Sequence, residues 1–269
     1  MYFIEDPRLV ALSSNVKIRP MKGLFNFIQV FEYLICYQMK RASTLFNIEY
    51  IIGGIGSTFR HSALREVGYY DTDTITEDID LTMKFIRLGN KEHRVAYGSD
   101  VTTYTESVLD LAGLIRQRFR WKYGRAQTFI KNSSLFFSPS KRHNRGLTWV
   151  YLPYALFSDL AFFLEPFMVT YILYIILAYS DWLTLMSAVT IIGAYLALNV
   201  IAEDTLAWKE KLKLVAVAPL MYFLLYLLSY VEYRALLKTY WKYNEIPASI
   251  QSSDCSWEHV ARAEVQEGV

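Results

Sequence analysis

Cysteine, proline and glycine are scarce in this sequence of 269 residues. Its two cysteines, Cys36 and Cys255, are far apart and stand in no metal-ligand spacing, which excludes a disulfide scaffold. Seven prolines and twelve glycines exclude a fibrous protein. Four scattered histidines are expected at the surface and not as metal ligands: His61, His93, His143 and His259.

Charge is missing from long stretches of the second half. No Lys or Arg stands between Arg145 and Lys209, and no charged residue from Leu214 to Val231. With 53% hydrophobic residues, the chain has too much apolar surface to be mainly disordered. A helix that crosses a bilayer needs about 20 apolar residues. We therefore predict three membrane segments, at about Leu160–Tyr179, Leu183–Ala202 and Leu214–Val231. The alternative is that these segments form the core of a very hydrophobic soluble protein.

Glu165 and Pro166 interrupt this apolar region. A carboxylate within a bilayer is costly unless it faces protein or water, and the proline starts or kinks a helix. Residues 149–164 are therefore a candidate interfacial or re-entrant helix, with the span after Pro166. The number of membrane helices predicted for residues 148–233 is three or four. Residues 234–269 form a polar C-terminal tail, whose side of the membrane the sequence leaves open.

Basic residues accumulate just before the membrane region. The stretch Arg116–Arg145 holds nine Lys and Arg and no acid, and residues 1–147 hold 21 Lys and Arg against 14 Asp and Glu. Positive charge next to a span stays on the cytoplasmic side. We therefore expect a multi-pass protein of the plasma (inner) membrane with residues 1–147 in the cytoplasm.

The first half alternates between strand and helix patterns, which predicts an α/β fold. A capping box of Thr74 and Glu77 is expected to start one helix, which ends at Leu88. The expected strands are Leu9–Ile18, Ile48–Ile52, Val95–Tyr97 and Val101–Thr105. The other expected helices are Lys22–Arg41, Ser57–Val67 and Ser107–Tyr123. No Gly-rich phosphate loop occurs in the first fifty residues.

Three carboxylates stand close together in Thr76-Glu77-Asp78-Ile79-Asp80. At a helix start they complement the helix dipole, which is a purely structural role. Alternatively, one of them takes a proton from a hydroxyl nucleophile. Asp78 and Asp80 share a helical face poorly, so we expect different tasks for them.

A second candidate site is Gln117-Arg118-Phe119-Arg120-Trp121. Two arginines can grip a pyrophosphate, and an indole can stack on a sugar ring. The alternative is a basic face against lipid headgroups.

The glycines of Gly53-Gly54-Ile55-Gly56-Ser57 allow a ligand to approach the backbone, or only form a tight turn after a strand. Asp71-Thr72-Asp73 and Asp78-Ile79-Asp80 both match the short metal–nucleotide pattern DxD. Because such matches are frequent by chance, we assign no metal ligand in this chain.

In order, these segments resemble the processive family 2 glycosyltransferases, which include poly-N-acetylglucosamine, chitin and hyaluronan synthases. The resemblance rests on GGIGSTFRHSALREVGYYDTDTITEDIDLTMKFIRLG, then TYTESVLDLAGLIRQRFRWKYGR, then membrane helices. The TED and QxxRW motifs are far more specific as a pair than alone.

The resemblance implies roles for these residues. Asp78 and Glu77 are the implied catalytic residues. Of the two, Asp78 is the implied general base that deprotonates the acceptor hydroxyl. The resemblance implies a GT-A type domain, a UDP-sugar donor, a polysaccharide or oligosaccharide acceptor, and Mg²⁺ or Mn²⁺ for the complete enzyme. Nucleic acid is not an expected partner. The implied substrate-binding residues are Gln117, Arg118, Arg120, Trp121, Gly53, Gly54 and Ser57.

The sequence also departs from the family. The donor-binding strands and the DxD aspartates of the family have no counterpart in this chain, so it matches the acceptor half of a partial domain. We therefore expect an inverting glycosyltransferase that is inactive as the isolated chain, with a partner chain as one source of the donor half. N-acetylglucosamine is the expected sugar. The alternatives are a non-processive lipid glycosyltransferase and a non-catalytic membrane subunit of a polysaccharide synthase.

Overall fold

The sheet of the first half is built on one central strand, β1 (Leu9–Ile18), as predicted. In the computed structural model, which describes residues 1–19 and 23–252, β1 pairs antiparallel with β2 (Thr58–Phe59) and parallel with β3 (Arg94–Thr105). The strand order within these residues is β2-β1-β3. The two short strands expected at 95–97 and 101–105 are thus one strand, whose pairing with β1 shifts register after Gly98.

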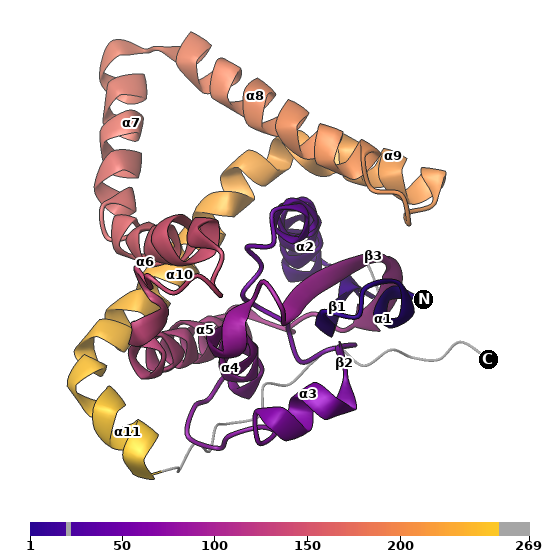
Figure 1. Ribbon diagram of the computed structural model, residues 1–269. Helices are drawn as coiled ribbons and strands as arrows, with labels where there is room; N and C mark the ends of the chain where they lie inside the picture. Colours follow the sequence, from indigo (N-terminus) through magenta and orange to yellow (C-terminus); the bar gives the residue numbers. More distant parts are fainter. Residues whose placement is uncertain (20–22, 253–269) are drawn as a thin grey trace.

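Helices surround this sheet (Figure 1). A core of apolar side chains from β1, β3, α3 and α4 seals one side of the sheet. The predicted start of α2, Lys22, lies outside the described residues, as do residues 253–269 of the predicted tail. The helices of the first half are α1 (Tyr2–Glu5), α2 (Leu24–Leu45), α3 (His61–Glu66), α4 (Glu77–Gly89) and α5 (Leu111–Lys131).

Two local predictions are wrong. Thr76, not Thr74, is the N-cap of α4, and the hydroxyl of Thr74 is buried without a hydrogen-bond partner among the described residues. The segment 48–52 is buried but forms no strand, because its amides bond to side chains. The amides of Tyr50 and Ile51 both donate to Glu49 Oε1, so no ladder partner is needed.

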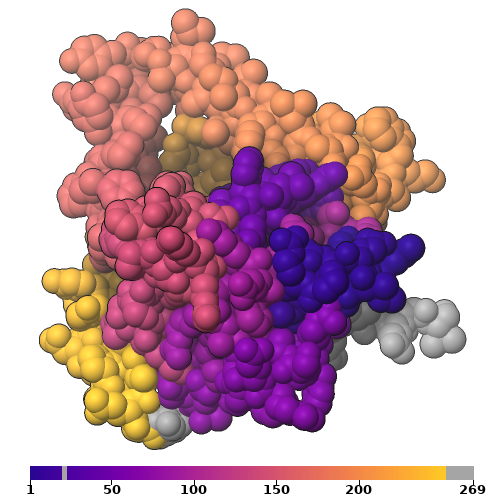
Figure 2. Space-filling view, viewed as in Figure 1, coloured from indigo at the N-terminus to yellow at the C-terminus, as the bar shows by residue number. Residues whose placement is uncertain are grey.

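The second half is entirely helical in its described part. Helices α7 and α8 meet at a turn far from the sheet and form an arm that projects from the molecule (Figures 1 and 2). The elements are η1 (Ser133–Leu135), η2 (Gly146–Tyr151), α6 (Leu152–Ala161), α7 (Glu165–Tyr179), α8 (Trp182–Ile201), α9 (Trp208–Val217), η3 (Ala218–Leu220), α10 (Met221–Trp241), η4 (Tyr243–Glu245) and α11 (Ile246–Ser252).

Two of the described helices are long and apolar enough to cross a membrane. They are Trp182–Ile201 and the continuous Trp208–Trp241. A third candidate is the pair Gly146–Ala161 and Glu165–Tyr179, which bends by 55° at its break. The break falls where Glu165 and Pro166 predict one.

The helices of the second half contact the first half at two places. Apolar residues of α2 form one core with residues of α8, α9 and α10, among them Phe31, Val200 and Met221. At the other end of the chain, Ser249 of α11 accepts a hydrogen bond of 2.9 Å from Gln127 of α5. The chain therefore returns to α5 after its apolar region.

Candidate active site

The carboxylate of Asp78 lies in the first turn of α4, beside the glycine loop that precedes β2. Its Oδ2 accepts a hydrogen bond of 2.8 Å from the amide of Gly54, and its Oδ1 accepts one of 2.8 Å from the amide of Ile79. Asp78 is half-buried, whereas Glu77 is exposed. Free amides at a helix start carry partial positive charge and attract carboxylate oxygens. Asp78 is thus oriented while part of its surface stays accessible.

One flank of the glycine loop is tied to α4. The amide of Ile52 donates to Thr82 Oγ1 over 3.1 Å, and the Thr82 hydroxyl donates to the carbonyl of Asp78 over 2.8 Å. Thr82 is fully buried, so these bonds are shielded from water. The loop and the TED helix consequently move as one unit.

The other flank is tied to the sheet through Gly56. This residue has a φ of +65°, and a Cβ built on it would overlap the side-chain oxygens of Ser14 and Thr103. Only glycine fits such a position. Ser57 donates a hydrogen bond to the carbonyl of Gly53 and closes the turn. Both flanks therefore fix Gly54 against Asp78.

Tyr70 is a residue near Asp78 that sequence reasoning missed. Its ring packs edge-on against Phe59 of β2, at 6.2 Å between ring centres. Burial, together with the negative charges of Asp78 and Glu77, raises the pKa of the Tyr70 hydroxyl. Tyr70 is 46% exposed, so this ring near Asp78 keeps surface that solvent reaches.

One face of α5 joins the two motifs. Successive residues of an α-helix turn by about 100°, so positions three, four and seven apart share a face. Gln117, Arg120, Gly124, Thr128 and Lys131 follow this spacing. The contacts of this face with residues 71–80 relate QxxRW to TED in space.

Gly124 of α5 packs closely against Thr76 of the TED segment. A Cβ on Gly124 would lie 2.7 Å from Thr76 Oγ1, so a larger residue would push the helix from the loop. One turn further, the hydroxyl oxygens of Thr128 and Thr76 lie 3.4 Å apart. Arg120 precedes Gly124 by one turn, about 6 Å along the helix axis. QxxRW and TED are therefore neighbours across this contact.

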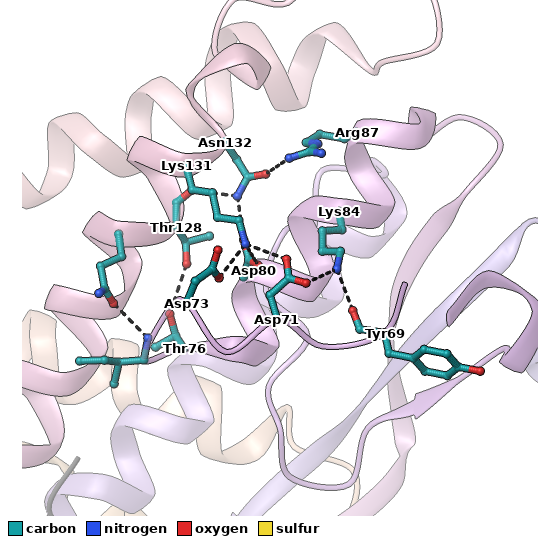
Figure 3. A network of polar contacts seen from close by, with 12 residues as sticks. Tyr69, Asp71, Asp73, Thr76, Asp80, Lys84, Arg87, Thr128, Lys131 and Asn132 are labelled. Atoms are coloured by element: carbon teal, nitrogen blue, oxygen red, sulfur yellow. Dashed lines mark hydrogen bonds and ion pairs between the residues drawn. The ribbon is translucent and has the colours of Figure 1, made fainter. Parts of the chain in front are cut away.

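A cluster of three aspartates flanks the TED segment (Figure 3). Asp80 is fully buried and accepts a hydrogen bond of 2.9 Å from Asn132 Nδ2. Lys131 Nζ donates, over 2.7 Å in each case, to Asp71, Asp73 and Asp80. Asp80 thus faces the end of α5 while Asp78 faces the glycine loop, and different tasks for the two remain a prediction.

The same cluster is the place where a metal ion would be sought. One oxygen from each of Asp71, Asp73 and Asp80 lies within 4.8 Å of the others, and carboxylates are the ligands that Mg²⁺ and Mn²⁺ prefer. Lys131 Nζ, however, already contacts all three. A divalent ion would repel this ammonium, so the residues do not fit a metal while Lys131 stays in place.

A second face of α5 binds α2, α6 and α10 through ion pairs. Arg118 pairs with Glu32 of α2 and, over 3.3 Å, with Glu232 of α10. Lys122 Nζ lies 2.9 Å from Glu232 and 2.8 Å from Asp159 of α6. These ion pairs fasten α2, α6 and α10 to the helix that carries QxxRW.

Arg118 does not point to open space. Its side chain is 2% exposed, and its guanidinium carbon lies 4.2 Å from the ring centre of Trp121. Burial by itself lowers the pKa of Arg118, but Glu32 and Glu232 outweigh it, so the arginine stays charged. Substrate binding by Arg118 remains a prediction that these contacts do not support, because both carboxylates already engage its guanidinium.

Gln117 lies in the α2–α5 interface. Its Oε1 accepts a hydrogen bond of 3.0 Å from Gln29, whose own Oε1 accepts from the amide of Val108. Gln117 is buried, whereas Arg120 and Trp121 are half-buried. The two half-buried residues are therefore the members of this motif that keep accessible surface.

The comparison with known proteins bears directly on this geometry. Residues 22–230 match the family described as "Glycosyl transferase family group 2". The chain belongs to this glycosyltransferase family.

Named relatives of the chain are polysaccharide synthases. It is 34% identical over 140 residues to poly-beta-1,6-N-acetyl-D-glucosamine synthase of Staphylococcus aureus (strain COL), which covers 52% of this chain and 32% of that protein. It is 32% identical over 167 residues to the synthase of the same name from Staphylococcus epidermidis, covering 56% of this chain and 39% of that protein. The chain thus spans about a third of the length of these relatives.

Membership establishes a glycosyltransferase domain followed by apolar helices, as the sequence predicts. Glycosyltransferases of this family commonly use a divalent metal.

Lys131, Gly124 and Tyr70 were not recognised from the sequence. Lys131 and Gly124 lie on the helical face of Gln117 and Arg120, so continuing the spacing of three and four residues along α5 would have found them.

Proposed function

We propose that this chain is part of a membrane-bound inverting glycosyltransferase that extends a polysaccharide from a UDP-sugar donor, with N-acetylglucosamine as the sugar. One observation carries the proposal. The Asp78 carboxylate is held by Gly54, remains partly accessible, and lies on the segment that packs against the QxxRW helix. The similarity to poly-beta-1,6-N-acetyl-D-glucosamine synthases supports the choice of sugar.

Asp78 acts as the general base in this proposal. Its carboxylate takes the proton from an acceptor hydroxyl, whose oxygen attacks the anomeric carbon of the donor sugar. The bond from that carbon to the UDP oxygen breaks, and a single displacement inverts the anomeric configuration. Two amide hydrogen bonds hold the carboxylate in one orientation before the acceptor arrives.

Arg120 and Trp121 are the proposed substrate contacts of α5. An indole offers an apolar face on which a sugar ring stacks, and a guanidinium pairs with phosphate oxygens. Gln117 and Arg118 hold these residues by tying α5 to α2 and α10. Mg²⁺ or Mn²⁺ on the donor neutralises the leaving diphosphate in such reactions. No step is assigned to an ion at the aspartate cluster, since Lys131 occupies it.

We further propose that residues 1–147 and α11 lie on the cytoplasmic side of the plasma membrane, so that residues 208–241, although apolar enough to span, begin and end on that side without crossing. The α8–α9 turn supports this arrangement, because Glu203 forms an ion pair of 2.7 Å with Lys17 of β1. The hydrogen bond from Gln127 to Ser249 supports it at the C-terminal side. Helices α7 and α8 then form a membrane hairpin with Asp181 at its far end.

The proposal is tested by binding of β-1,6-linked N-acetylglucosamine oligosaccharides to the purified chain in nanodiscs. We expect saturable binding that Trp121→Ala weakens at least about tenfold, because the stacking surface is lost. Asp78→Asn should bind nearly as well as the parent, since it keeps a hydrogen-bond acceptor. Trp149→Ala, at an exposed site of η2, is the matched control. Binding that is absent, or indifferent to Trp121, would refute this role.

A further inference from the structure

Lys131 stands where three carboxylates converge. Its Nζ lies 2.7 Å from an oxygen of Asp71, Asp73 and Asp80 alike, and its side chain is 16% exposed. Asp80 is 1% exposed at its side chain, and therefore depends on a partner for its charge. The ammonium holds the position that a bound cation would take among these ligands.

The rest of the network confirms that Lys131 is the central charge. Lys84 contacts only Asp71 of the three, over 2.8 Å, and also bonds to the carbonyl of Tyr69. Asn132 supplies a neutral donor to the second oxygen of Asp80. Figure 3 shows Lys131 between the three aspartates, with Lys84 to one side.

The cluster encloses the catalytic segment. Asp73 and Asp80 bracket residues 74–79, so both ends of the TED segment are attached to the last turn of α5. Between these ends, the amide of Ile75 donates to Gln127 Oε1 over 3.0 Å. A shift of Lys131 would therefore release both ends of the segment that carries Asp78.

We propose that Lys131 is a built-in cation that replaces a metal ion at this cluster and positions Asp78 against the QxxRW helix. Wild-type protein then binds no divalent ion there. Removal of the ammonium leaves three carboxylates within reach of one another, a donor set that suits Mn²⁺. The positioning role rests on the proposed function, whereas the replacement of a metal does not.

The replacement is tested with Mn²⁺ alone, by electron paramagnetic resonance on the full chain in nanodiscs. Lys131→Ala should gain one Mn²⁺ site that disappears when Asp80→Asn is added. Wild type, Lys131→Arg and the matched control Lys84→Ala should lack this Asp80-dependent site. Mn²⁺ should also raise the unfolding temperature of Lys131→Ala and leave that of wild type unchanged.

Two results would overturn the replacement. One is an Asp80-dependent Mn²⁺ site in wild type, and the other is a folded Lys131→Ala chain without any such site. If Lys131→Ala does not fold, Lys131→Met combined with Asp73→Asn lowers the uncompensated charge. That variant should bind Mn²⁺ more tightly than Asp73→Asn alone, and equal binding by the two would refute the proposal.

The positioning role is tested separately by oligosaccharide affinity. Lys131→Ala should lose affinity, whereas Lys131→Arg should retain most of it and Mn²⁺ should restore it to Lys131→Ala. Affinity that is unchanged in Lys131→Ala would refute positioning. If wild type binds no oligosaccharide at all, the proposed function fails while the Mn²⁺ result still decides the replacement.

Discussion

Ser229 of α10 donates a hydrogen bond of 2.6 Å to Glu165 at the start of α7. Glu165 is the carboxylate that interrupts the apolar second half of the sequence. The bond gives this polar group a protein partner between two helices that are far apart in sequence. A carboxyl group with such a partner is tolerated in an apolar setting where a free one is not.

Loss of this partner should weaken the contact between α7 and α10. We expect Ser229→Ala to lower the free energy of unfolding by about 1 kcal/mol, because the half-buried carboxylate of Glu165 loses this donor. Thermal unfolding in nanodiscs measures this change. Ser187→Ala, on an exposed part of α8, is the control and should change little. Equal effects of the two substitutions would argue against the bond.

Gly56→Ala should destabilise the glycine loop. The left-handed φ and the overlap with Ser14 and Thr103 predict a loss of about 1–3 kcal/mol. Gly53→Ala is the matched control, since a Cβ there has no atom within 4 Å. Chemical denaturation compares the two variants. A Gly56→Ala chain as stable as Gly53→Ala would show that this packing is absent.

Glu203 should make the chain sensitive to acid. Burial alone raises its pKa, but hydrogen bonds from Lys17 and Thr205 outweigh it and hold the pKa below the ordinary 4.5. Because the folded-state pKa is the lower one, Glu203 adds stability above pH 4.5 that is lost as the pH falls through the folded-state value.

The measurement is the unfolding temperature between about pH 6 and pH 3. Glu203→Gln should be less stable than wild type at the upper end and should lose less stability on acidification. Asp204→Asn is the neighbouring control, because Asp204 is 75% exposed at its side chain. A Glu203→Gln curve parallel to that of wild type would contradict the assignment.

The side on which α11 lies can be tested by labelling. In a chain whose two cysteines are replaced by serine, Ser252→Cys should react with the same membrane-impermeant maleimide as Thr72→Cys, and from the same face. Asp181→Cys should react from the opposite face. Labelling of position 181 from the same face as position 72 would exclude the hairpin arrangement of α7 and α8, and labelling of position 252 from the opposite face would exclude the cytoplasmic placement of α11.

The purified chain alone is expected to release no UDP from UDP-N-acetylglucosamine with Mn²⁺. The described residues offer the leaving diphosphate no free carboxylate cluster for its metal, since Lys131 holds the one that exists. A coupled assay for UDP measures the reaction, with Asp78→Asn as the background. Turnover that depends on Asp78 and Mn²⁺ would prove this expectation wrong.

Sequence patterns identified the elements that present the motifs. The apolar residues of β1 and the acids at the start of α4 predict their structures, because burial and the helix dipole act locally. The extent of α5 was underestimated, with its end placed at Tyr123 and not Lys131. Gly124 looks like a helix end, yet it continues the helix because Thr76 packs against it.

Other features depend on partners distant in sequence. The segment 48–52 has a strand-like composition, but Glu49 and Thr82 take its amides. The role of Arg118 depends on Glu32 and Glu232, which lie 86 and 114 positions away along the chain. No spacing rule relates such residues, so only the structure distinguishes an arginine between helices from one that faces a ligand.

The close packing of Gly124 on Thr76 also bears on how this domain tolerates insertions. The relation between TED and QxxRW is set by this contact across space, and not by the residues between the two motifs. Between the two motifs along the chain, β3 shifts register after Gly98, and Asp100 and Val101 in that irregular stretch are exposed. A change of length at this exposed stretch would therefore leave the Gly124–Thr76 contact, and the separation of the two motifs, in place.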